Sequence, residues 1–243
     1  MAMRILITND DGVNASQLLP LIKWCSKLGE VTTVAPKFEQ SGKSHGIEIH
    51  KAFEAKEVEL EPGITAWAVD STPADCVRFA VLGLNLEFDL VISGVNRGLN
   101  VGADIMYSGT VSAVMEAANL GLKAIALSTT PDNYSKATEE LDKVFAFVAE
   151  HKLLDLSDIW NINIPASPKA IRITRQGGPY YSDNFQPQEN DMFLPLGVDV
   201  FTPADNYDRD TDTVLRGGMI SMMPLTTDRT NLAVYRQFCA LND

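Results

Sequence analysis

The chain has 243 residues, which is enough for one large α/β domain or for a domain with an appendage. Its 32 acidic residues outnumber its 20 basic ones, and the formal net charge of −12 argues against a nucleic-acid groove or an anionic membrane surface as a partner. The three cysteines are widely spaced without a CxxC pair, which indicates neither a zinc cluster nor a disulfide framework and predicts reduced thiols in a cytoplasmic protein.

The first elements are a strand, a helix and a second strand. Residues 4–9, RILITN, are an apolar run rich in β-branched side chains, which is typical of a buried strand. Residues 15–29 place apolar side chains at helical spacing, with Gly29 at the expected stop. Residues 30–36, EVTTVAP, have the composition of another strand.

The alternation of strands and helices continues through the first two thirds of the chain. Further strands are predicted at residues 88–96, 123–129 and 158–165, and helices at 72–85, 110–121 and 135–152. This order predicts an α/β fold, a Rossmann-like doubly wound and mostly parallel sheet with helices on both faces. Such sheets bind ligands beyond the carboxyl ends of their strands, near the point where strand order reverses.

Two regions depart from the alternation. Residues 45–69 alternate apolar and polar side chains around a glycine turn near Gly63, which predicts an antiparallel excursion. From about residue 171 onward, short β-like runs mix with Gly, Pro, Asn and Asp, which favours loops and hairpins. We therefore expect one domain over residues 1–243, with a core of about 1–170 and a C-terminal extension with a hairpin over about 171–243.

No apolar run approaches about 18 residues, so we expect no membrane span. The N-terminus enters a strand pattern directly and lacks the regions of a signal peptide. The short runs of the C-terminal third offer each other little apolar area, and isolated hairpins are marginal in water. We therefore expect this part to pack on a second copy of the chain, in a homodimer or homotetramer.

Two aspartates, Asp10 and Asp11, directly follow the first predicted strand and precede Gly12. A turn at Gly12 would bring both carboxylates to one side, where a hard cation such as Mg²⁺ or Mn²⁺ would find oxygen ligands. A cation offsets the paired charges, whereas in a bare pair one pKa is raised. The alternative is a plain turn with a solvated aspartate and a helix cap.

A glycine-rich stretch, residues 93–110, runs from a predicted strand into a predicted helix. Glycines let backbone N–H groups approach an anion, and a helix N-terminus favours negative charge. Ser108, Gly109 and Thr110 are therefore a candidate phosphate seat, and the alternative is an ordinary Ser/Thr N-cap. The chain has no GxSxG elbow, and no histidine partner for Ser108 is apparent, so we interpret this serine as a phosphate ligand and not as a nucleophile.

Ser41 and His45 follow the second predicted strand, at the same expected edge as the aspartates. A lone loop histidine is more often structural than catalytic. Glu116 and Asp104 are interpreted as solvated or capping residues.

Five motifs occur in order over residues 4 to about 130: ILITNDDG, VAPKFEQSGKSHGI, DSTPADCV, FDLVISGVNRGLNVGADIMYSGTVSAVMEA and IALS. Weaker similarity continues through NINIP and RGGMISMMPLTTD. Together they resemble the survival protein SurE family of metal-dependent nucleoside monophosphate phosphatases. The resemblance implies a Rossmann-like core, one divalent metal ion (Mg or Mn), and a C-terminal hairpin that exchanges between subunits.

The resemblance also implies the residues of a site. The implied metal ligands are Asp10, Asp11, Ser41 and Asn96, and either aspartate could accept a proton from the attacking water. The implied phosphate-facing residues are Asn9, Asn100, Ser108, Gly109 and Thr110. Lys43, Gly46 and the run SMMPL depart from the family pattern in the expected wall of the substrate pocket.

The expected activity is that of a 5′-nucleotidase, a phosphomonoesterase that hydrolyses nucleoside 5′- or 3′-monophosphates to nucleoside and phosphate with the help of the metal. One alternative is a phosphatase with an aspartyl-phosphate intermediate, as in the haloacid dehalogenase class, although that class carries DxD where this chain has adjacent aspartates. The other alternative is a nucleotide-binding protein without enzymatic activity.

Overall fold

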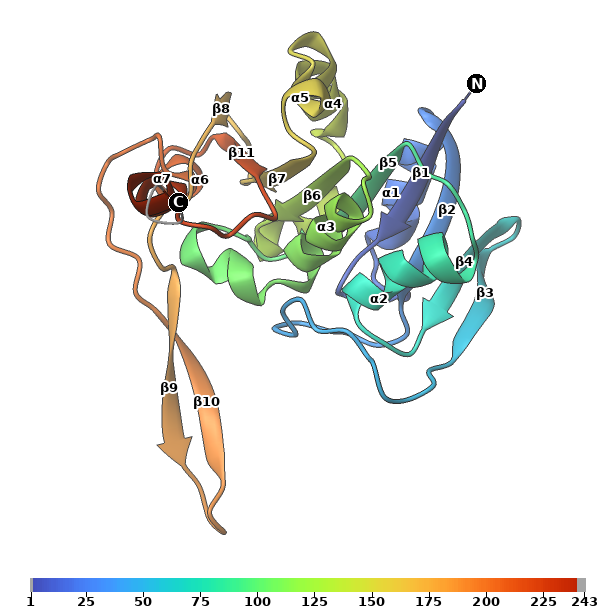
Figure 1. Ribbon diagram of the computed structural model, residues 1–243, viewed down its shortest axis with the longest axis horizontal. Coiled ribbons are helices and arrows are strands. Elements are labelled where there is room, and N and C mark those ends of the chain that lie inside the picture. The colour runs from blue at the N-terminus through green and yellow to red at the C-terminus, as the bar shows by residue number, and fades with distance from the viewer. Residues whose placement is uncertain (1, 240–243) are drawn as a thin grey trace.

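The computed structural model describes residues 2–239, and its main feature is a nine-stranded mixed sheet with helices on both faces (Figure 1). The strands are β1 (Met3–Thr8), β2 (Gly29–Pro36), β3 (Ala55–Glu61), β4 (Ile64–Val69), β5 (Leu90–Arg97), β6 (Ala124–Thr129), β7 (Ile159–Ile164), β8 (Ile171–Ile173) and β11 (Ile220–Leu225). Their order in the sheet is β3-β4-β2-β1-β5-β6-β7-β11-β8. From β4 to β7 all neighbours pair in parallel, which confirms the predicted α/β fold.

The helices form two layers. One layer has α1 (Leu18–Cys25), α4 (Leu141–Glu150) and α5 (Leu153–Leu156), and the other has α2 (Pro73–Arg78) and α3 (Gly109–Asn119). Shorter segments are the π-helical η1 (Phe79–Gly83) and the 3₁₀ segments η2 (Gly102–Tyr107) and η3 (Pro131–Lys136). The C-terminal part adds α6 (Asp210–Leu215) and α7 (Leu232–Phe238). No helix within residues 2–239 combines the length and apolar character that a membrane crossing needs.

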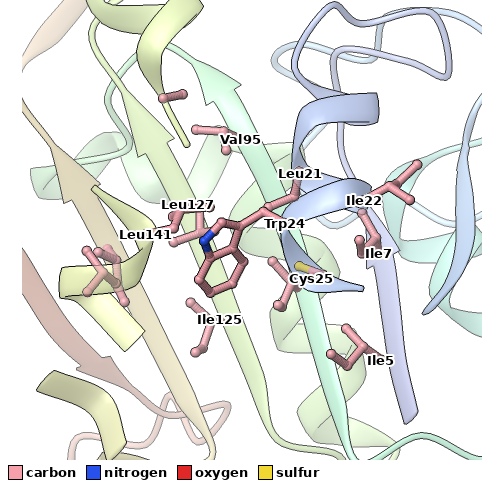
Figure 2. Close-up of a cluster of buried hydrophobic side chains, with 14 of the residues drawn as sticks. Ile5, Ile7, Leu21, Ile22, Trp24, Cys25, Val95, Ile125, Leu127 and Leu141 are labelled. Atoms are coloured by element: carbon pink, nitrogen blue, oxygen red, sulfur yellow. The ribbon is translucent and has the colours of Figure 1, made fainter. Parts of the chain in front are cut away.

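The apolar run of β1 is explained by burial on both faces of the sheet. Ile5 and Ile7 belong to the buried cluster on the α1 side (Figure 2), while Leu6 packs on the side of α2 and α3. A parallel strand covered on both faces needs apolar side chains at successive positions. This core fixes the carboxyl end of β1, from which the two aspartates project.

The strand order reverses between β1 and β5. The chain goes from β1 to β2 and β4 on one side, and then returns to pair β5 with the other side of β1. In open α/β sheets, the crevice at such a reversal is the usual ligand site. Asp10 and Asp11 lie just beyond β1, and Asn96 lies at the end of β5, so the candidate ligands meet at this place.

The C-terminal part confirms one expectation and corrects another. A hairpin of β9 (Tyr181–Pro187) and β10 (Phe193–Asp199) extends away from the main sheet and is exposed along both strands (Figure 1). The runs at residues 170–176 and 219–225, however, do not form loops and hairpins outside the main sheet. They supply β8 and β11 to the main sheet, with Ile220 and Met222 buried in its core. The domain division at about residue 170 stays a prediction.

The antiparallel excursion is shorter than the pattern indicated. Only residues 55–69 form it, as β3 and β4, and β4 also pairs in parallel with β2. Residues 45–54 form no strand, although they alternate. Ile47 and Ile49 there are exposed, because no sheet face is available to bury them.

Candidate metal and phosphate site

The turn after β1 is closed by Asn9. Its Oδ1 accepts a hydrogen bond from the Gly12 N–H at 3.1 Å, and its Nδ2 donates to the Gly12 carbonyl at 2.9 Å. Gly12 has φ of 93°, a conformation that favours glycine. Both polar ends of the Asn9 amide therefore hold the turn that presents the aspartates, and its expected contact with phosphate stays a prediction.

Asp10 is buried against the N-terminus of α3. Its Oδ1 accepts a hydrogen bond from the Thr110 hydroxyl at 2.5 Å. A Cβ at Gly109 would lie 2.8 Å from the Asp10 Cβ, so glycine lets the helix approach this closely. Burial raises the pKa of Asp10, and the hydrogen bonds from Thr110 oppose that rise.

Asp11 lies at the mouth of the site. Its Oδ2 accepts hydrogen bonds from the Arg97 N–H at 3.1 Å and from the Tyr134 hydroxyl at 3.3 Å. Burial and the neighbouring charge of Asp10 raise the pKa of Asp11 to about 6. Two close carboxylates whose pKa values are both raised are an arrangement that a bound cation would relieve.

A cleft of about 520 Å³ opens beside Asp11. Its lining consists of Asp11, Ala15, Ser16, Glu39, Ser41, Arg97, Pro131 and Tyr134. The Gln40 N–H donates to the Asp10 carbonyl at 2.7 Å, which brings the Ser41 loop to the aspartates. The Ser41 hydroxyl donates to Glu39 Oε1 at 2.8 Å, so its oxygen keeps a lone pair for a ligand.

Asn96 joins this group from the end of β5. Its Nδ2 donates to the Gly98 carbonyl at 2.9 Å, which leaves Oδ1 as the atom for a ligand, and the next residue contacts Asp11. The structure thus brings three segments with the four implied metal ligands to one edge of the sheet. All four offer oxygen atoms, as Mg²⁺ or Mn²⁺ requires. No cluster of three or more His, Cys, Asp or Glu that could hold a metal ion occurs within residues 2–239, so an ion at this place would also need hydroxyl or amide oxygens as ligands.

Ser108 is the N-cap of α3. Its Oγ accepts a hydrogen bond from the Val111 N–H at 3.1 Å, and its carbonyl accepts from the Ser112 hydroxyl at 2.6 Å. The capping role that the sequence left open is therefore real. The serine hydroxyl still has a proton to donate, and the first N–H groups of a helix have no partner within it. The candidate phosphate seat thus lies directly beside Asp10.

The glycine-rich loop after β5 is tied to the ends of β6 and β7 by Asn100. Its N–H donates to Asn163 Oδ1 and its Nδ2 to Ser128 Oγ, both at 2.8 Å. Its carbonyl accepts from Nδ2 of Asn161 and of Asn163, also at 2.8 Å each. These contacts make Asn100 an anchor of the loop, and its expected contact with phosphate stays a prediction.

Several residues of the site were missed from the sequence. Asn161 and Asn163 lie two apart in an apolar strand, which places them on one face and was a readable sign of a buried polar network. Arg97 directly follows Asn96, and Tyr134 follows the carboxyl end of β6. Glu39, two residues before Ser41, gave no separate signal.

Two expectations for acidic residues were wrong in part. Glu116 is buried, and His45 and Arg78 both contact its carboxylate, which compensates for burying the charge. Asp104 accepts hydrogen bonds from the N–H groups of Tyr180 and Tyr181 at 2.9 and 2.7 Å, so it holds the base of the hairpin.

Comparisons with known proteins show which family the chain belongs to. The family model described as Survival protein SurE matches residues 5–183. A 5′-nucleotidase SurE from Clostridium beijerinckii is 36% identical, covering 96% of each chain, and one from Carboxydothermus hydrogenoformans is 39% identical over 94% of this chain and 92% of its own. The crystal structure of SurE protein from Aquifex aeolicus matches with a TM-score of 0.76 and 30% identity over 99% of this chain and 100% of its own. The chain belongs to the survival protein SurE family, as its ordered motifs predicted.

Proposed function

We propose that this chain is a metal-dependent phosphomonoesterase that hydrolyses nucleoside 5′- or 3′-monophosphates to nucleoside and phosphate. The relatives named 5′-nucleotidase support the substrate class. The observation that carries the proposal is the contact of Asp10 with the first turn of α3, because it places two carboxylates next to a helix N-terminus. Acid pairs attract cations and helix N-termini attract phosphate, so the two features together fit a phosphate ester bound with a metal ion.

We assign the cation, Mg²⁺ or Mn²⁺, to Asp10, Asp11, Ser41 and Asn96. When bound, such an ion supplies positive charge to phosphoryl oxygens and lowers the pKa of a bound water. The chain contributes the orientation of the ligands. Thr110 holds Asp10, while Tyr134 and the Arg97 N–H hold Asp11. Asp10 and Asp11 are also the candidates to accept the water proton, and only Asp11 lines the cleft.

The phosphoryl oxygens are assigned to the first turn of α3, at Ser108, Gly109 and Thr110. Backbone N–H groups fixed in advance stabilise developing negative charge without having to reorganise. The cap formed by Ser108 holds that turn in place. Asn9 and Asn100 keep the two flanking loops in position, and we also assign them to the surroundings of the phosphate.

The hairpin supports an assembly of more than one copy. Phe185 and Phe193 are 61% and 60% exposed, and a two-stranded ribbon alone is marginal in water. We propose a homodimer or homotetramer in which the hairpin packs on another copy; a monomer in light scattering at micromolar concentration would contradict this. Cys25 and Cys76 are buried free thiols, which fits a cytoplasmic location.

The test is phosphate release from AMP by the purified protein, with Mn²⁺ or Mg²⁺ and again with excess EDTA. Release that needs the ion supports the proposal, and absence of release under both conditions favours a nucleotide-binding protein instead. Mass spectrometry of the quenched reaction separates the remaining alternative, because a phosphorylated aspartate would indicate a covalent mechanism. Asp10 is only 3% exposed, which argues against it as a nucleophile.

A further inference from the structure

The loop that carries Ser41 is long and lacks regular structure. Residues 37–54 connect β2 to β3 without a helix or strand. Ile47 and Ile49, its apolar side chains closest to Ser41 on the C-terminal side, are exposed. Hydrophobic burial therefore does not fix the middle of this loop, and other contacts must hold Ser41 at the cleft.

Polar contacts attach the loop to the layer of α2 and α3. The Ser44 N–H donates to the Tyr107 carbonyl at 3.0 Å, and its hydroxyl donates to the Met106 carbonyl at 2.7 Å. The Gly46 carbonyl accepts from the Thr72 hydroxyl at 2.7 Å. These contacts are exposed, so water competes for each of them.

Other contacts of the loop are sheltered. Backbone N–H groups make two of them, from Gln40 to the Asp10 carbonyl and from Glu48 to Asp75 Oδ2, and the side chain of His45 makes another, to Glu116. His45 Nε2 lies 2.8 Å from Glu116 Oε2, and the side chain of Glu116 is only 8% exposed. The other oxygen of Glu116 accepts from Arg78 Nη1 at 2.9 Å. A sheltered carboxylate held by two side chains is geometrically defined, since leaving either oxygen unpaired would be unfavourable.

This contact joins two parts of the proposed site. Glu116 belongs to α3, whose first turn is the candidate phosphate seat. His45 is in the loop that carries Ser41 and lines a separate groove, whereas Ser41 lines the cleft beside Asp11. The pair thus fixes the Ser41 loop relative to the helix that contacts Asp10.

We propose that His45, acting through Glu116, is a positioning residue that holds Ser41 in place to bind the cation. The inference rests on the proposed function, in that Ser41 is taken as a metal ligand. His45 itself touches neither the cation nor the substrate. Its loss should loosen the loop and weaken ion binding, while catalysis at saturating ion should stay close to that of the wild type.

The test compares His45→Ala with a matched control in the same loop, His50→Ala. The side chain of His50 is exposed and has no hydrogen bond within residues 2–239. Mn²⁺ binding is measured by calorimetry on chelator-stripped protein, and hydrogen exchange is followed in residues 37–54. Loss of groups that orient metal ligands typically weakens metal affinity about 10- to 100-fold. We expect that loss and faster exchange for His45→Ala, and wild-type behaviour for His50→Ala.

Two further variants separate positioning from a general structural effect. His45→Gln keeps an N–H that can reach Glu116 and should restore Mn²⁺ affinity to within about threefold of the wild type. The double variant that combines His45→Ala with Glu116→Gln should bind Mn²⁺ less than about twofold more weakly than the Glu116→Gln single variant. This is expected because the two residues act as a unit, so removing the second partner has little further effect.

Equal Mn²⁺ affinity of His45→Ala and the wild type would overturn the inference, as would an equal loss in His50→Ala. If His45→Ala does not fold, Glu116→Gln decides by the same measurement. Failure of the proposed function has a different signature: the wild type would release no phosphate from AMP, while ion binding and hydrogen exchange would still report on the pair.

Discussion

The two loops that meet at the cleft are held by opposite means. The aspartate loop is four residues long, Asn9 to Gly12, and follows a strand buried on both faces. The Ser41 loop spans residues 37–54 and depends on polar contacts, among them the sheltered contact between His45 and Glu116. A ligand on a short loop beside a rigid strand is placed by the fold itself, whereas a ligand on a long loop needs additional anchors.

The charges of the two loops also differ. Burial raises the pKa of both aspartates, so in the absence of a cation the aspartate loop opposes folding at neutral pH. The hydrogen bond from His45 lowers the pKa of Glu116, so the anchor of the Ser41 loop favours folding at the same pH. The comparison indicates that the aspartate loop is shaped for a positive ligand, whereas the negative charge of Glu116, which anchors the second loop, is already met by His45 and Arg78.

The largest effect is expected for Asp11→Asn and Asp10→Asn. Each change removes one negative charge from the proposed ion site, and Lewis-acid stabilisation is worth several kcal/mol in the transition state. We expect a loss of about 100-fold or more in kcat/KM for AMP, with weaker Mn²⁺ binding. An amide at position 10 can still accept from Thr110, so the fold should survive. Near-normal turnover at saturating ion in either variant would refute the site assignment.

A graded effect is expected for Ser108→Ala. If its hydroxyl donates to a phosphoryl oxygen, the loss is one hydrogen bond to a charged group, about 1.5–3 kcal/mol. That corresponds to roughly 10- to 150-fold in rate if the bond forms only in the transition state. Removing the cap should also lower stability by about 0.5–2 kcal/mol.

Rapid quenching with labelled AMP tests the role of Ser108. Under the proposed mechanism no phosphoserine forms. A phosphoserine at position 108 that forms and decays fast enough for turnover would make this serine a nucleophile.

The smallest effects are expected in how the thermal stability of chelator-treated protein depends on pH. The pKa of Asp11 in the folded state is about 6, above its ordinary value of 3.8. The contribution of Asp11 to the free energy of unfolding is therefore fully present below about pH 4 and is lost as the pH rises through 6. Asp11→Asn should therefore raise Tm relative to wild type at neutral pH and leave it nearly unchanged at about pH 4. A Tm difference independent of pH would contradict the cause assigned to the shift.

Glu116→Gln should change Tm at neutral pH in the opposite direction to Asp11→Asn. The pKa of Glu116 is lowered in the folded state. The contribution of its carboxylate to the free energy of unfolding is therefore present above about pH 4.5 and is lost as the pH falls through the folded-state pKa. Glu116→Gln should reduce Tm at neutral pH and converge with wild type in acid. Thermal melts of the two variants in one buffer series, both with EDTA, check the contrast directly; a Glu116→Gln curve that runs parallel to wild type at all pH values would count against the anchor.

The same comparison shows what the sequence could and could not predict. Apolar runs such as RILIT and the alternation with helices were sufficient for the parallel sheet, because strands buried on both faces have a strong local signal. The aspartate loop was readable for the same reason, since it follows such a strand directly.

The rest depends on contacts between residues far apart in the chain. His45 and Glu116 are 71 residues apart, and nothing local to either one predicts their pairing. The run ISMMPL was expected to belong to loops and hairpins outside the main sheet, but it enters the sheet as β11 because β7 offers it an antiparallel edge. The contact of Tyr134 with Asp11 likewise arises only after the sheet brings η3 close to the turn that follows β1.

The central claim is that a divalent cation binds between the two loops. Diffraction from crystals grown with Mn²⁺, recorded at a wavelength where manganese scatters anomalously, tests it most directly. The account predicts one strong peak within about 2.0–2.6 Å of oxygens from Asp10, Asp11, Ser41 and Asn96, the range for hard divalent ions. A fully occupied peak elsewhere, or none at this place at millimolar Mn²⁺, would contradict it.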